Sequence, residues 1–170
     1  MWVFDATPLI YLAKVDRLDL VQHLDGSCVI PDRVYEEVVE AGIEQGYPDA
    51  RRIERGVEND LFDVVSVEPT ALVSRLQRND NLSDADIAVL ARAAAHDGVA
   101  VMDEAYGRDV AATEGVTTRG TAYLVLVLAS DGTISVDEAR TVIDTMIDEG
   151  WYCAPNVYAN IVRKLESLAE

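Results

Sequence analysis

Residues 1–14 read MWVFDATPLIYLAK, a short apolar run that ends in one aspartate and passes directly into a helix-like segment. The apolar run is too short for a membrane span or for the apolar region of a signal peptide. It is better explained as a buried strand, with Thr7 and Pro8 at the start of a helix. Asp5 then lies at the carboxyl end of a strand, where open α/β sheets bind their ligands. The competing interpretation is that Asp5 only caps the helix, because aspartate is a preferred N-cap residue.

The alternation of strand and helix continues along the chain. Apolar runs typical of strands occur at residues 28–30, 62–67, 99–102 and 116–118, the second of them with the weak pattern of an edge strand. No repeat, low-complexity segment or linker interrupts the 170 residues, a length that suits one domain. We therefore expect one domain over residues 1–170, of the α/β class, with a mainly parallel sheet and helices on both faces.

The charge balance is unusual. The chain has 31 acidic and 14 basic residues, a net charge of −17, and only Lys14 and Lys164 are lysines. A chain this acidic would ordinarily repel nucleic acid. The acids are dispersed and almost no lysine occurs, which is typical of halophilic proteins, and in molar salt the Debye length is only about 3 Å. We therefore attribute the net charge to the environment rather than to the substrate.

Nothing in the sequence indicates export or membrane insertion. No stretch approaches the ~20 apolar residues of a membrane span, and no signal peptide with a cleavage site is recognisable. Cys28 and Cys153 lie in apolar surroundings without the spacing of a metal site. We expect both to be reduced core thiols in a cytoplasmic protein.

Several acids follow an expected strand or open an expected helix. They are Asp5, Glu37, Asp84, Asp86, Asp103 and Glu104. Strand carboxyl ends and the N-termini of the following helices share one rim of a parallel sheet, so these carboxylates can converge. Each acid also has a simpler explanation when it is considered alone: it could stabilise a helix N-terminus, lie on a solvent-exposed helix face or form part of a turn. Converging carboxylates repel one another unless a cation joins them, and oxygen ligands suit Mg²⁺ or Mn²⁺, which can hold a water against a scissile phosphate.

The opening residues carry a family resemblance. Residues 4–14 resemble the start of PIN-domain proteins, and most of all a VapC-like prokaryotic ribonuclease subfamily that begins D-x-[ST]-P-L-I-Y-L-A-K. Residues 29–38, VIPDRVYEEV, are similar to the second motif of that family, in which the acid stands three residues after the valine. That spacing selects Glu37 over Glu36.

The remaining motifs follow in the same order. Residues 83–91 resemble the third motif, residues 101–108 the fourth, and residues 119–121 and 150–158 resemble later segments. The resemblance, which covers nearly the whole chain, implies a three-layer α/β/α PIN-like fold and a ribonuclease site that uses Mg²⁺ or Mn²⁺.

The resemblance also implies roles for particular residues. Asp5, Glu37, one acid of the third motif and Asp103 are the expected metal ligands, with Thr7 helping to order Asp5. In the third motif the subfamily spacing favours Asp84, whereas an L-S-x-x-D match favours Asp86. In the fourth, the strand before Asp103 is one residue short of the family pattern, so Glu104 can take the place of an aspartate that is common there.

The leading hypothesis is a metal-dependent endoribonuclease acting on RNA. The resemblance adds a toxin role, with a small antitoxin protein as partner, and a homodimer. Arg108 follows the acids of the fourth motif by about one helical turn and is expected to face the phosphate, unless it forms a salt bridge with a site carboxylate. The alternative function is a catalytically inactive PIN-like module that binds RNA or a protein.

Two phosphoryl-transfer folds also place an aspartate after the first strand, and the sequence disfavours both. A haloacid-dehalogenase-like phosphatase requires D-x-D there, but position 7 is Thr7. A response-regulator receiver requires a late lysine, and none occurs between Lys14 and Lys164.

Overall fold

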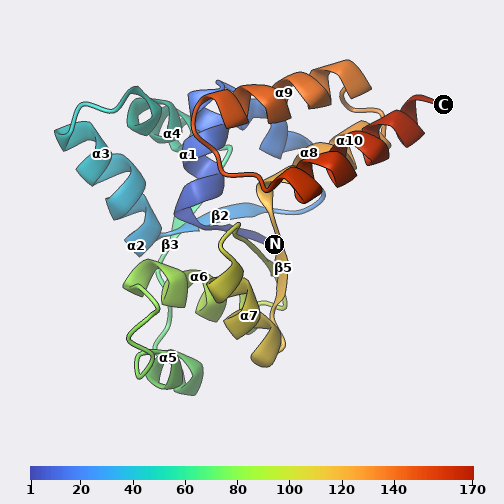
Figure 1. Cartoon of the computed structure of the whole chain (residues 1–170). Coiled ribbons are helices and arrows are strands. Elements are labelled where there is room, and N and C mark those ends of the chain that lie inside the picture. The colour runs from blue at the N-terminus through green and yellow to red at the C-terminus, as the bar shows by residue number, and fades with distance from the viewer.

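A five-stranded parallel sheet lies between two layers of helices in the computed structural model, which describes residues 1–170 (Figure 1). The strands are β1 (Trp2–Phe4), β2 (Cys28–Pro31), β3 (Asp63–Val65), β4 (Val99–Val101) and β5 (Thr117–Arg119). Their spatial order is β3-β2-β1-β4-β5, and every neighbouring pair is parallel. The predicted three-layer α/β/α fold is confirmed, and β3 is an edge strand.

The strand order creates a switch point beside β1. From β1 the chain proceeds outward to β2 and β3, and it then returns to the other side of β1 as β4 and β5. The carboxyl ends of β1 and β4 are in register, with Phe4 paired to Val101, and the backbone N–H of Asp5 donates to the Val101 carbonyl at 3.0 Å. Such a switch point is where open α/β sheets bind ligands.

Helices cover both faces of the sheet. On one face lie α1 (Ala6–Lys14), α4 (Pro48–Glu58) and α8 (Thr121–Ser130), with α9 (Val136–Asp148) and α10 (Pro155–Ala169) packed on α8 (Figure 1). On the other face lies α6 (Asp84–Ala95), flanked by α5 (Ala71–Leu76) and α7 (Ala105–Thr113). None of the helices combines the length and the apolar composition needed to cross a bilayer.

Two helical segments differ from a regular α-helix. The segment after Asp16 forms a 3₁₀ helix, η1 (Leu18–His23). The segment after Pro31 is divided into α2 (Asp32–Tyr35), a π-helical turn η2 (Glu36–Glu40) and α3 (Ala41–Glu44). Periodicity shows which residues face the core, but the hydrogen-bond pattern of each turn depends on the packing around it.

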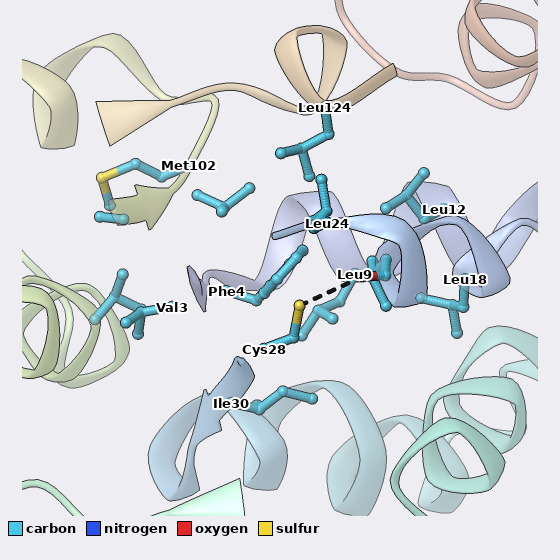
Figure 2. Close-up of a cluster of buried hydrophobic side chains, with 14 of the residues drawn as sticks. Val3, Phe4, Leu9, Leu12, Leu18, Leu24, Cys28, Ile30, Met102 and Leu124 are labelled. Carbon is cyan, nitrogen blue, oxygen red and sulfur yellow. Dashed lines mark hydrogen bonds between the residues drawn. The ribbon is translucent and has the colours of Figure 1, made fainter. Parts of the chain in front are cut away.

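The hydrophobic core joins the sheet to both helix layers. Phe4, Leu9, Ile30 and Met102 are fully buried and appear in Figure 2. The Phe4 ring meets Phe62 edge-on, with ring centroids 5.3 Å apart. This burial explains why the strands read as apolar runs rather than as alternating patterns.

The two cysteines are both free thiols. Cys28 is buried, and its thiol donates weakly to the Val21 carbonyl, the dashed line in Figure 2. Burial raises the pKa of the Cys28 thiol to about 11, so it stays protonated and acts as a small apolar group. Cys153 is half-buried at the edge of the core.

Candidate functional site

Asp5 is the buried acid at the switch point. Only 7% of its surface is exposed. It stands at the N-cap position of α1, but its side chain makes no capping hydrogen bond. The interpretation of Asp5 as a helix cap is therefore wrong. An aspartate that is buried and does not cap is unfavourable by itself, which points to a role beyond the fold.

The electrostatics of Asp5 identify its neighbours. The pKa of Asp5 is raised from 3.8 to about 7, mainly by burial; the backbone N–H of Ala6 opposes the shift, and the charges of Asp86, Glu37 and Glu104 contribute to it. These three acids come from α6, from η2 and from the turn after β4. Four predicted acids thus share one electrostatic environment, and we name them the acid rim: Asp5, Glu37, Asp86 and Glu104.

No member of the acid rim forms an ion pair. The salt bridges of the structure use other acids: Asp16, Asp19, Glu36, Glu54, Glu114, Glu138 and Asp144. The four negative charges therefore have no basic side chain to neutralise them.

A capping box fixes Asp86 at the start of α6. The Ser83 hydroxyl accepts from the Asp86 backbone N–H at 3.0 Å, and the Ser83 N–H donates to Asp86 Oδ2 at 3.1 Å. The helix-end explanation of Asp86 is therefore correct, yet it leaves Oδ1 without a hydrogen bond and the charge still acts on Asp5. Asp84 lines an open depression of about 370 Å³ together with Glu36 and Glu37, so it lies beside one member of the acid rim.

Glu37 lies in the π-helical turn η2 rather than in a regular helix. It is exposed, whereas the next two residues, Val38 and Val39, are buried. The valines hold the turn against the core, so Glu37 is directed outward from a fixed backbone. Single π-helical turns are rare and occur frequently at functional sites.

Asp103 and Glu104 are neighbours in sequence but serve different regions. Asp103 Oδ1 accepts from the Thr121 N–H at 2.7 Å, and Oδ2 accepts from the Thr121 hydroxyl at 2.8 Å and from Trp151 Nε1 at 3.1 Å. Glu104, at the N-cap of α7, makes no capping hydrogen bond and acts on Asp5. Thr121 and Trp151 were not predicted as site residues, although both lie in segments that resemble the family.

Thr7 and Arg108 were predicted to assist the site. Thr7 lies in the first turn of α1, and no hydrogen bond joins its hydroxyl to Asp5. Arg108 is exposed on α7 and lines a cleft that also contains Asp103. It forms no salt bridge, although its guanidinium and Asp103 Oδ1 both lie next to Gly120.

The acid rim fits a hard cation in its chemistry. No three acidic, histidine or cysteine side chains are arranged to hold an ion directly. Mg²⁺, however, usually keeps several waters and takes only one or two carboxylates from the protein. Four unpaired carboxylates, one of them buried with a strongly raised pKa, supply oxygen donors and an unbalanced negative charge. These are the properties that Mg²⁺ or Mn²⁺ requires.

Comparisons with known proteins agree with this geometry. A family model described as "DUF3368: PIN domain" matches residues 1–167. No curated protein sequence matches the chain. Among solved structures, the crystal structure of PAE2754 from Pyrobaculum aerophilum is similar, with 21% identity, a TM-score of 0.54, and coverage of 76% of this chain and 96% of that chain. This likeness concerns the fold.

Two further structures are more distantly similar. VapBC-1 from nontypeable Haemophilus influenzae has 15% identity and a TM-score of 0.47, with coverage of 71% of this chain and 97% of that chain. A domain of a functionally unknown protein from Methanocaldococcus jannaschii has 13% identity and a TM-score of 0.46, with coverage of 70% and 89%.

Proposed function

The chain belongs to the PIN-domain family, and from this premise we propose that it is a metal-dependent endoribonuclease that hydrolyses phosphodiester bonds in RNA. PIN domains are generally nucleases. The observation that carries the proposal is Asp5, a buried carboxylate whose pKa is raised to about 7 and which has three unpaired acids around it. If Asp5 had only a structural role, an apolar residue in its place would make the protein more stable.

Asp5, Glu37, Asp86 and Glu104 would hold Mg²⁺ or Mn²⁺. When bound, the ion would activate a water and stabilise charge on the phosphate. The protein supplies the arrangement: β1 holds Asp5, the capping box holds Asp86, and η2 holds Glu37. Carboxylates fixed before the substrate arrives require little reorganisation during the reaction.

Arg108 and Thr7 are the proposed substrate contacts near the acid rim. Arg108 has no acidic partner, so its guanidinium is available to a phosphate. The Thr7 hydroxyl makes no hydrogen bond to Asp5 and lies in the first turn of α1, where helix N–H groups favour an anion.

The decisive test measures RNA cleavage with Mn²⁺ at high salt. Asp5→Asn should lower the rate by at least about 100-fold, because the neutral amide removes the buried charge that attracts the ion. Asp137→Asn is the control, since Asp137 is an exposed acid in the first turn of α9. Equal rates for the wild type and Asp5→Asn would exclude the proposed chemistry.

Three pairs of neighbouring acids can be used to test which residues bind the metal ion. In each pair, the first acid is one whose charge contributes to the raised pKa of Asp5: Glu37 against Glu36, Asp86 against Asp84, and Glu104 against Asp103. Amide substitution of the first member should reduce cleavage more than substitution of the second. If Asp84 and Asp103 instead prove more important, the ion is held by the acids that the family resemblance favours.

The remaining alternatives have their own measurements. A catalytically inactive module that binds RNA or a protein would show no calorimetric heat with Mn²⁺. The toxin role and the homodimer are predictions from the resemblance. Growth arrest on expression, relieved by a small co-expressed neighbour, tests the first, and sedimentation at micromolar concentration and high salt tests the second.

A further inference from the structure

A second hollow lies beside the acid rim, and we name it the arginine–tyrosine cleft. It has a volume of about 520 Å³ and lies where α7, the start of α8 and the segment before α10 come together. Its lining includes Arg108, Arg119, Tyr123, Tyr152 and Val157. In Figure 1 the start of α10 lies next to the start of α8, on the side of the sheet away from α6.

Both arginines of the cleft lack an acidic partner. Six other arginines form salt bridges: Arg17, Arg33, Arg51, Arg52, Arg75 and Arg140. The carboxylate within the cleft, Asp103, already accepts hydrogen bonds from Thr121 and Trp151. In a chain of net charge −17, two unpaired guanidinium groups in one hollow make a local site for an anion.

Exposed aromatic rings stand beside these cations. The Arg119 guanidinium lies over the Tyr123 ring, 4.9 Å from its centroid. Tyr152 is 84% exposed, the highest value among the large apolar side chains that reach the surface. The neighbouring Trp151 is buried and bonded to Asp103, so the backbone that carries Tyr152 is anchored. An anchored but exposed ring is suited to stacking on a flat partner.

The cleft and the acid rim meet at two consecutive residues. Asp103 forms part of the cleft wall, and Glu104 belongs to the acid rim. The cleft therefore adjoins the acid rim at this turn.

We propose that the arginine–tyrosine cleft binds single-stranded RNA adjacent to the acid rim, with Arg108 and Arg119 on phosphates and Tyr152 and Tyr123 on bases. The inference deepens the proposed function and relies on it for RNA as the substrate. A single strand is required because the faces of paired bases are covered by their neighbours in a duplex. Stacking on an aromatic side chain strengthens binding roughly 5- to 150-fold per base, whatever the base.

The test measures binding separately from cleavage. A short fluorescently labelled single-stranded RNA is titrated with full-length Asp5→Asn protein in Mg²⁺, and gel analysis verifies that the RNA stays intact. In this background Tyr152→Ala should weaken binding roughly 5- to 150-fold. The control is Tyr47→Ala, because Tyr47 is 52% exposed and precedes α4, far along the chain from the cleft. A duplex of the same sequence should bind these variants equally.

Substitution of an arginine in the cleft should also change the salt dependence of RNA binding. Arg119→Gln should lower the affinity for all sequences and reduce the salt dependence of binding by about one counterion. Arg51→Gln is its control, because Arg51 is paired with Glu54 at 3.1 Å. Circular dichroism of each variant establishes that it is folded.

The outcomes separate the two proposals. The inference is overturned if the protein does not bind the single strand, or if Tyr152→Ala and Arg119→Gln bind it as tightly as their controls. A cleft that binds a protein instead would give that second result. The proposed function fails independently, if the wild type shows no metal-dependent cleavage. With both correct, Tyr152→Ala in the active protein raises KM and leaves kcat unchanged.

Discussion

Asp5 and Asp103 each follow a central strand of the same sheet, and their surroundings are opposite. Asp5 is buried, makes no capping hydrogen bond, and the side-chain charges that act on it are all negative. Asp103 accepts three hydrogen bonds, two from Thr121 and one from Trp151. The first arrangement stores unfavourable electrostatic energy that a cation can release, and the second ties the start of α8 and the segment before α10 to the sheet. One residue type at equivalent places thus lacks neutralising partners in one case and is fully hydrogen-bonded in the other.

The largest expected effect is a gain of stability on removing the charge of Asp5. Because the pKa of Asp5 is about 7 in the folded protein and 3.8 ordinarily, the folded state binds the proton more tightly. The stability that this group contributes is present at low pH and is lost as the pH rises from about 4 to 7. In metal-free buffer at pH 8, Asp5→Asn should therefore be more stable than the wild type, by up to about 4 kcal/mol.

Denaturant unfolding with EDTA at pH 4 and pH 8 checks this prediction. The difference between the two proteins should be small at pH 4, where the wild-type carboxyl is protonated in both states. A variant that is less stable than the wild type at pH 8 would show that Asp5 has a favourable partner.

The next effect is a loss of stability at Asp103. Asp103→Ala leaves the Trp151 indole N–H and both Thr121 donors without their acceptor, which should cost roughly 3 kcal/mol of unfolding free energy. The matched variant is Glu104→Ala, because Glu104 is exposed and makes no capping hydrogen bond. It should change stability by less than about 0.5 kcal/mol. Equal losses in the two variants would remove the contrast between these neighbours.

Metal binding should reverse the instability of the acid rim. At a free concentration 100 times its Kd, Mn²⁺ would stabilise the wild type by about 2.7 kcal/mol. Thermal unfolding at pH 8 with and without Mn²⁺ measures this as a rise in Tm. The rise should largely disappear in Asp5→Asn and persist in Asp103→Asn. The same rise in wild type and Asp5→Asn would place the ion elsewhere.

The smallest effect concerns the cap that holds Asp86. Ser83→Ala removes the hydroxyl that accepts from the Asp86 N–H and should cost about 1 kcal/mol of stability. Ser135→Ala is a close control, because its hydroxyl accepts from the Glu138 N–H at 3.0 Å at the start of α9. Both variants should lose similar stability, and only Ser83→Ala should also slow RNA cleavage.

Much of the fold was predictable, because apolar runs and helix caps are local signals. The five strands, the parallel arrangement and the edge position of β3 follow from such patterns. The helix types were harder to predict, because the sequences of η1 and η2 have the pattern of ordinary amphipathic helices. Their hydrogen bonding depends on how the turns pack, and periodicity does not record that.

For the candidate site, the sequence identified the set of acids but not their partners. It left open Asp84 against Asp86 and Asp103 against Glu104. The structure places Asp86 and Glu104 near Asp5 and bonds Asp103 to Thr121 and Trp151, residues that lie 18 and 48 positions further along the chain. Partners so distant leave no local signal in one sequence.

Strand ends and helix starts are encoded by neighbouring residues, so the amino-acid order alone places acids after the central strands, at the carboxyl rim of a parallel sheet. Which carboxylates share a charge environment, and which accept hydrogen bonds, depends on the folded chain. Burial and electrostatic interaction vary with distance in space, and residues far apart in the chain set that distance. Two adjacent residues, Asp103 and Glu104, can therefore belong to different sites.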